Sequence, residues 1–204
     1  MSLNLKGGIA RSQYKNSILK EIVRKSIHMC SAFVPFFLRI AYMPVLVLLG
    51  AALIFYCISE FLRLKGVELP FIAKVTAVAA RKRDENKFVL GPVTLVLGII
   101  ISAVLWNPSA AAIGIYALSF GDGLASLSGK LFGRVYIPCT HGKTVAGSLT
   151  CFLAVYISSF CVCGDAAVAF FLAFSAMVIE VIPLADLDNV VIPVAIGALA
   201  HYLV

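Results

Sequence analysis

The sequence predicts an all-α, polytopic integral membrane protein, and two properties of its composition support this. Of its 204 residues, 61% are hydrophobic and only 13% are charged, whereas soluble domains are roughly half apolar and one quarter charged. The mean hydropathy of +1.00 agrees with this contrast. The apolar residues also gather into runs that approach the roughly 20 residues a helix needs to cross a bilayer. We therefore expect a bundle of transmembrane helices.

About seven apolar runs qualify as transmembrane helices by length and hydropathy. They cover residues 27–41, 43–62, 89–106, 109–131, 144–163, 166–183 and 189–204. Short polar stretches separate them and leave almost no room for a soluble domain. We expect a basic interfacial arm at residues 1–25, followed by a single transmembrane domain at residues 26–204.

The N-terminal arm is basic and is not expected to be a secretory signal, because it has no early apolar core or small-residue cleavage site. Its apolar residues would share one face of a helix, with basic residues around the rest. This pattern is typical of a helix that lies at the membrane surface and leads into the first span. The residues of the apolar face are Ile18, Leu19, Ile22 and Val23.

The positions of the basic residues predict the orientation. If the N-terminus is cytoplasmic, the arm and the connections 63–88, 131–143 and 184–188 also face the cytoplasm. Together with Lys130 they carry every Lys and Arg except Arg39. We interpret the net charge of +7 as a topology signal that also attracts anionic lipid headgroups. A nucleic-acid partner is not expected, because a soluble basic domain is lacking.

Several spans carry polar residues near their predicted cytoplasmic ends. Placing a charged side chain inside a bilayer costs several kcal/mol unless it faces a partner or a water-filled cavity. A structural role fits single residues: Glu60 could pair with Arg63 or Arg24, and His28 could hydrogen-bond locally. Because five or six helices place polar residues at the same depth, we instead expect these residues to form one site. Its candidate members are His28, Glu60, Asp122, Lys143, Thr144, Ser148, Glu180, Asp186, Asp188 and Asn189.

The residue types limit the chemistry of this site. Carboxylates beside basic groups suit a divalent cation and a phosphate ester, because hard oxygens bind Mg²⁺ and cations neutralise phosphate. A zinc site is not expected, since His28 is isolated and the six cysteines lack the usual metal spacing. A serine hydrolase is not expected either, because a G-x-S-x-G motif is missing.

The triplet Gly142-Lys143-Thr144 resembles the end of a P-loop. That motif needs a glycine five positions before Gly142, where this chain has Ile137. A lysine at the start of a helix can still present a charge, backbone N–H groups and the helix dipole to phosphate. Nearby, Ala125, Gly129 and Gly133 form a ridge of small residues that is typical of close helix packing.

Five segments, in this order, resemble the CTP-dependent lipid kinases, the group of dolichol kinase, phytol kinase and CTP-using diacylglycerol kinase, which is related to the phosphatidate cytidylyltransferases. The segments spread across nearly the whole chain. They are VRKSIHMCSAFVPF at 23–36, SEFLRL at 59–64, FGDGLASLSGKLFGR at 120–134, GKTVAGS at 142–148 and DLDNVVIP at 186–193.

The resemblance implies a membrane enzyme that transfers the γ-phosphoryl group of CTP to a polyprenol, a phytol-like alcohol or diacylglycerol at the cytoplasmic face. Mg²⁺ or another divalent cation would assist. The catalytic candidates are Asp122, Lys143, Asp188, His28 and Glu60, and the metal candidates are Asp122, Asp188 and Glu180. The nucleotide-binding candidates are Gly121, Gly123, Lys130, Gly133, Arg134, Gly142, Lys143, Thr144, Gly147, Ser148 and Asn189. Whether a carboxylate or His28 accepts the alcohol proton stays open.

One position departs from the family pattern, and two alternatives remain. Many members have glutamate where this chain has Ala146. A phosphatidate cytidylyltransferase is the first alternative, but its late basic, histidine-glycine-glycine and aspartate-arginine-x-aspartate signature is absent from EVIPLADLDNVVIP at 180–193. A small ion-coupled transporter is the second, although we find no convincing internal repeat of the kind such proteins show.

Overall fold

The computed structural model describes residues 18–67, 76, 87–140 and 142–204. Over these residues the regular secondary structure is helical, apart from an isolated bridge between Tyr136 and Thr144. The expected all-α class is confirmed. Most of the predicted arm at 1–25, and most of the 63–88 connection, lie outside the described residues.

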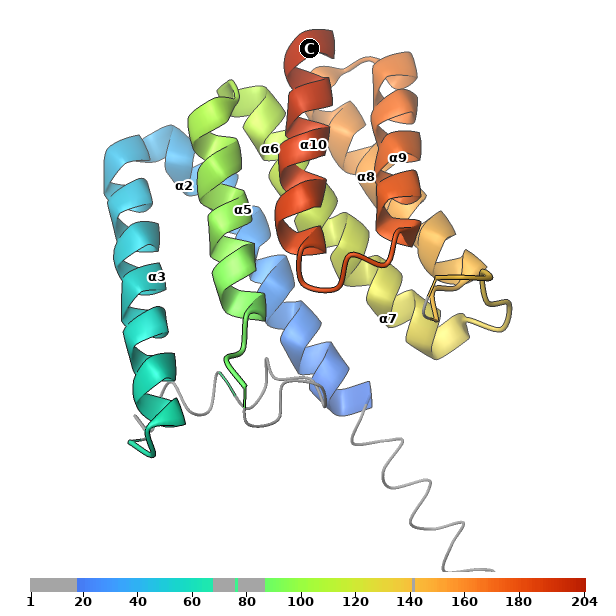
Figure 1. Cartoon of the computed structure of the whole chain (residues 1–204). Helices are drawn as coiled ribbons and strands as arrows, with labels where there is room; N and C mark the ends of the chain where they lie inside the picture. The colour runs from blue at the N-terminus through green and yellow to red at the C-terminus, as the bar shows by residue number, and fades with distance from the viewer. Residues whose placement is uncertain (1–17, 68–75, 77–86, 141) are drawn as a thin grey trace, which may run out of the picture.

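The helices lie side by side in a bundle (Figure 1). Each predicted apolar run corresponds to a helical segment, and the ends agree within a few residues except at the start of the first run, which was predicted at residue 27 although the chain is already helical at residue 18. The first segment is α-helical over the described residues 18–29. The following elements are η1 (Cys30–Phe33), α2 (Val34–Ile40), α3 (Tyr42–Leu64), α5 (Gly91–Leu105), α6 (Pro108–Tyr116), η3 (Ala117–Asp122), α7 (Gly123–Phe132), α8 (Val145–Cys163), α9 (Ala166–Val181) and α10 (Asp188–Leu203).

Three of the described helices are long and apolar enough to cross a membrane, namely Tyr42–Leu64, Pro108–Phe132 and Val145–Cys163. The helices Gly91–Leu105, Ala166–Val181 and Asp188–Leu203 are also apolar but shorter. Large apolar side chains such as Val47 and Ile157 are exposed on the outside of the bundle. A surface of this kind is suited to contact with lipid chains.

Local capping signals explain where the helices begin and end. Asn107 caps the start of α6 by accepting a hydrogen bond from the N–H of Ala110 at 2.8 Å, and Pro108 occupies the first turn. Gly164 ends α8 in the left-handed conformation, with φ of 72°. Asp165 then caps α9 by accepting from the N–H groups of Ala167 and Val168. These residues make α8 and α9 a tight antiparallel pair.

The continuous segment α6–η3–α7 lies at the centre of the bundle. Within it, 72% of an apolar stretch of 18 residues is buried. Its buried side chains pack with those of α8, α9 and α10 in one apolar core. At Gly114 the backbones nearly touch, because a Cβ there would lie 2.3 Å from the carbonyl oxygen of Pro193. The central segment is therefore held on several sides, which fixes the position of its polar residues.

One end of the bundle collects most of the described basic side chains. At this end α3, α7 and α9 finish and α5, α8 and α10 begin (Figure 1). We call it the basic end, and its cations include Arg24, Lys25, Arg63, Lys130 and Lys143. Arg39 lies at the opposite end, in the last turn of α2.

Candidate active site

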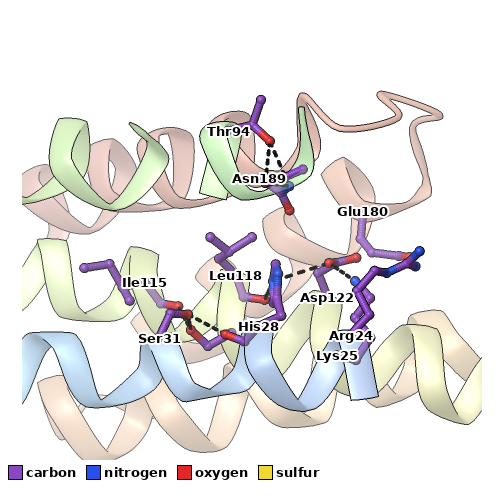
Figure 2. A network of polar contacts seen from close by, with 12 residues as sticks. Arg24, Lys25, His28, Ser31, Thr94, Ile115, Leu118, Asp122, Glu180 and Asn189 are labelled. Carbon is purple, nitrogen blue, oxygen red and sulfur yellow. Dashed lines mark hydrogen bonds and ion pairs between the residues drawn. The ribbon is translucent and has the colours of Figure 1, made fainter. Parts of the chain in front are cut away.

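Asp122 is the last residue of a π-helical turn, η3, inside the long central helix. Such turns contain one extra residue and frequently occur at functional sites. The side chain of Asp122 is only 2% exposed, and its carboxylate accepts a hydrogen bond from the ammonium of Lys25. The Nε2 atom of His28 lies 3.6 Å from the same carboxylate oxygen (Figure 2). The helical segment over residues 18–29 is thereby connected to η3.

His28 is oriented by a second contact. Its Nε2 atom lies 3.2 Å from the carbonyl oxygen of Leu118, and because a carbonyl can only accept, this nitrogen carries the hydrogen. Three residues further on, Ser31 bonds the hydroxyl of Ser119 at 2.5 Å. Lys25, His28 and Ser31 thus form one face of a helix that lies along η3.

Lys143 reaches the site from the connection before α8. Its Nζ atom donates a hydrogen bond of 2.5 Å to Oε1 of Glu180 on α9. Burial favours the neutral amine, but the charge of Glu180, this hydrogen bond and the charges of Asp122 and Asp188 outweigh it. The pKa of Lys143 is therefore raised above its usual 10.5. The ammonium stays protonated at neutral pH and can neutralise an anion.

Glu21 belongs to the same end of the bundle and was not among the predicted site residues. It accepts hydrogen bonds from Arg24 and, at 2.6 Å, from Lys130. Burial favours the neutral acid, but the hydrogen bond from Lys130 and the charges of Arg24, Lys130 and Lys25 outweigh it and hold the pKa of Glu21 below its usual value. The helical spacing of Glu21, Lys25 and His28 was the available sequence signal, since the three share one face.

Two neighbouring cavities open among these residues. The first, which we call the Asp122 cavity, has a volume of about 410 Å³, and its polar lining is Lys25, Asp122, Ser126, Thr140, Lys143 and Asp188. The second, the Lys130 cavity, has a volume of about 360 Å³, and its lining includes Glu21, Arg24, Lys130, Lys143, Thr144 and Glu180. Lys143 lines both cavities, so the two are adjacent at its side chain.

Many of the residues predicted from the sequence meet here. Asp122, Lys143 and Asp188 line the Asp122 cavity. Ser148 does not appear in either lining, but its hydroxyl donates to Glu180 at 3.4 Å. The predicted residues that line the Lys130 cavity are Lys130, Gly142, Lys143, Thr144, Gly147 and Glu180.

Glu60 and Asn189 are placed differently, and neither lines these two cavities. Glu60 is fully buried and accepts two hydrogen bonds from Arg63, at 2.7 and 2.9 Å, and one from the N–H of Val89 at 2.9 Å. The pairing with Arg63 is the structural role considered for it above. Asn189 donates to the hydroxyl of Thr94 at 3.0 Å (Figure 2), which connects α10 to α5.

Predicted nucleotide-binding glycines take part in close helix packing. A Cβ at Gly147 would lie 2.9 Å from the carbonyl oxygen of Ala125, so α7 and α8 approach closely there. A Cβ at Gly133 would lie 2.6 Å from Cγ2 of Thr144, and one at Gly129 would lie 2.9 Å from Oγ1 of the same residue, which caps α8. The packing role expected for the ridge of small residues is confirmed. Gly121 and Gly123 also face neighbouring side chains, and Arg134 is exposed and lines neither cavity.

The acidic side chains of the two cavities can be compared with what the predicted Mg²⁺ would need as ligands. Among the described residues there is no group of three or more His, Cys, Asp or Glu side chains that could hold a metal ion by itself. Asp122 and Asp188 nevertheless line one cavity, and Mg²⁺ is commonly bound by one or two carboxylates together with substrate phosphates. The residues therefore fit a cation that arrives with phosphate. Glu180 is engaged by Lys143 and lines the other cavity.

Comparison with known proteins identifies related enzymes. The chain is 30% identical over 158 residues to a probable chloroplastic phytol kinase 1 of Oryza sativa subsp. japonica, which covers 68% of this chain and 49% of the rice protein. It is 32% identical over 82 residues to a chloroplastic farnesol kinase of Arabidopsis thaliana, covering 39% and 27% of the two chains. It is 29% identical over 85 residues to a CTP-dependent diacylglycerol kinase 1 of Eremothecium gossypii, covering 42% and 26%.

The chain is a homologue of the CTP-dependent lipid kinase group. The resemblance found from the five sequence segments is thereby confirmed. This lipid kinase homologue spans about half the length of the rice phytol kinase that it matches. No family model matches the chain, and no solved structure does.

Proposed function

We propose that the chain is an integral membrane lipid kinase that transfers the γ-phosphoryl group of CTP to a lipid alcohol. The observation that carries this proposal is the Asp122 cavity. Two carboxylates and two lysines from four distant parts of the chain line this one space. Phosphoryl transfer needs mainly positioning and neutralisation of charge, and this combination of residues is suited to both.

The related proteins support the substrates. Their names give phytol, farnesol and diacylglycerol kinases, and one name specifies CTP as the donor. Each named acceptor is an apolar molecule with one free hydroxyl, as are the polyprenols. We therefore propose a hydroxyl-bearing lipid that reaches the cavity from the side, between helices, with its hydroxyl at the headgroup level.

We further propose that about seven helical segments cross the membrane, with the N-terminus and the basic end in the cytoplasm. The clustering of cations at one end supports this orientation, because basic residues favour the cytoplasmic side. The two cavities would then open at the cytoplasmic face, where nucleotides are available.

Lys143 is the proposed main contact for the phosphates, since it lines both cavities. The first turn of α8 contributes less than its sequence suggests. The N–H of Val145 already bonds the carbonyl oxygen of Val135 at 3.0 Å, and that of Gly147 bonds the hydroxyl of Thr144 at 3.2 Å. Lys25 and Lys130 would supply further positive charge on either side of Lys143.

Asp122 and Asp188 would hold Mg²⁺, which would neutralise charge on the transferring phosphoryl group. The alcohol proton would pass to a carboxylate of the Asp122 cavity. His28 lines neither cavity, and its Nε2 atom, which lies 3.6 Å from Asp122, already donates to Leu118. We therefore assign His28 the role of positioning Asp122 rather than that of general base.

The decisive assay uses purified protein with Mg²⁺ and CTP or ATP labelled on the γ-phosphate. Phytol, farnesol, dolichol-like alcohols, diacylglycerol and phosphatidate serve as acceptors. Label that moves from CTP onto an alcohol supports the proposal. Release of pyrophosphate with formation of a CDP-lipid from phosphatidate would instead identify a cytidylyltransferase.

Two variants connect this activity to the cavity. Asp122→Asn and Lys143→Met should each abolish turnover, because one removes the buried carboxylate charge and the other the cation shared by both cavities. Lys65→Gln, which changes an exposed cation that lines neither cavity, is the matched control and should retain normal activity. Normal turnover in Asp122→Asn or Lys143→Met would refute the site.

A further inference from the structure

Arg39 is separated from the other described cations. It lies in the last turn of α2 at the end of the bundle opposite the basic end. Lys25 is fourteen residues earlier in the same run of helical turns, which corresponds to about 20 Å along the axis. The side chain of Arg39 is exposed and forms no hydrogen bond or ion pair within the described part of the chain.

Two apolar cavities adjoin this arginine. The first, which we call the Trp106 cavity, has a volume of about 460 Å³, and its lining includes Leu38, Tyr42, Val104, Trp106 and Ile115. The second, the Phe120 cavity, has a volume of about 620 Å³, and its lining includes Tyr116, Phe120, Leu124, Ile157 and Val162. Arg39 lines both, and among the described residues of the two linings it is the one charged side chain.

An exposed guanidinium group between two apolar cavities is suited to pair with an anion. Charges at membrane depth are normally paired or in contact with water or headgroups, and the described residues supply no carboxylate for Arg39. Its planar donors match the oxygen geometry of a phosphate group. Two apolar spaces that share this cation also match a molecule with two hydrocarbon chains.

We propose that Arg39 and the two adjoining cavities bind a diacyl phospholipid, with its phosphodiester at the guanidinium and one acyl chain in each cavity. The Phe120 cavity extends along the central helix from Tyr116 to Leu124, so the chain within it runs from the membrane surface towards the interior. The phosphodiester lies at the headgroup level opposite the basic end. A free phosphate ion would use Arg39 alone and leave the cavities without a role.

This proposal rests on the proposed membrane insertion but not on the proposed kinase reaction. Its test therefore measures lipid binding rather than turnover, and the two proposals can fail separately. The full chain, purified in detergent, is titrated with phosphatidylglycerol, and the bound lipid is measured by native mass spectrometry. Circular dichroism of each variant checks that the helices are intact.

Arg39→Gln should bind phosphatidylglycerol about tenfold more weakly, which corresponds to the loss of one charge-assisted contact. Lys65→Gln removes one exposed cation at the other end of the bundle and should bind as the wild type does. Ala154→Phe fills part of the Phe120 cavity, and Val104→Trp fills part of the Trp106 cavity. Each of these two variants should also reduce binding.

Three results would overturn the proposal. The first is wild-type affinity in Arg39→Gln, and the second is an equal loss in Lys65→Gln, which would indicate a nonspecific charge effect. The third is displacement of the lipid by inorganic phosphate together with unchanged binding in Ala154→Phe and Val104→Trp. That combination would reveal a simple anion contact without a site for acyl chains.

Discussion

Replacement of Lys25 by methionine tests the contact between the first helix and η3. The side chain of Lys25 is 5% exposed and that of Asp122 is 2% exposed. Without the ammonium, the carboxylate keeps the Nε2 atom of His28 at 3.6 Å, and this nitrogen already donates to Leu118. The change therefore leaves a buried charge without its main counterion, while the methionine retains most of the apolar volume of the lysine chain.

The expected loss of stability in Lys25→Met is large. Removal of one partner from a buried ion pair lowers the free energy of unfolding by about 3–5 kcal/mol. Removal of both charges, in Lys25→Met/Asp122→Asn, should return the stability to within about 1 kcal/mol of the wild type, because an uncharged pair needs no counterion. The proposed kinase activity should be lost in both variants, since both remove groups that line the Asp122 cavity.

Unfolding by denaturant in detergent micelles, followed by circular dichroism, measures these differences. Lys20→Met is the matched control, because Lys20 is exposed on the same helix, and its effect should stay within about 0.5 kcal/mol. The reasoning is refuted if Lys25→Met is as stable as Lys20→Met. It is also refuted if the double variant loses as much stability as the two single variants combined.

Three further predictions concern helix packing, Asn189 and pH. Gly147→Ala places a Cβ 2.9 Å from a backbone carbonyl oxygen of α7, so it should cost about 1–3 kcal/mol of stability and reduce turnover about tenfold by shifting Lys143. Gly50→Ala, where no atom lies within 4 Å, should cost nothing in either assay, and equal effects would contradict the packing argument. Asn189→Leu should lower the free energy of unfolding by about 1–2 kcal/mol through its lost hydrogen bonds and leave the KM for CTP unchanged, whereas a raised KM at normal stability would restore its predicted role in nucleotide binding. Because the pKa of Lys143 is raised on folding, its contribution to stability is fully present below the unfolded value and is lost as pH rises through the folded one. The stability difference between wild type and Lys143→Met should thus stay constant from about pH 7 to pH 10 and shrink only above that range, and a decline already near pH 8 would contradict the assignment.

Much of the fold could be predicted because its signals are local. Runs of apolar residues placed the helices, since an element that faces lipid must be apolar along its whole length. Pro108, Gly164 and Asp165 mark helix ends through backbone preferences that need no tertiary contact. The π-helical turn before Asp122 could not be predicted, because it depends on how the central helix packs against its neighbours.

The candidate site was predicted in part. Asp122, Lys143 and Asp188 were expected to share one depth, and the structure places them around one cavity. Glu60 has the same apparent depth and the same charge, yet it belongs to a separate cluster with Arg63 and Val89. The position of a residue in the sequence indicates its depth along a helix but not the direction in which its side chain points. For this reason the sequence could not distinguish Glu60 from the residues of the Asp122 cavity.

The sequence by itself determined the helical class, most of the helix boundaries, the basic end and the relation to lipid kinases, because each of these depends on composition, local spacing or motif order. The tertiary structure decided which charges meet. It paired Lys25 with Asp122 across 97 positions of the chain and Lys143 with Glu180 across 37. It also left Arg39 between two apolar cavities at the other end. Such pairings depend on the rotation and packing of whole helices, which no local pattern of residues specifies.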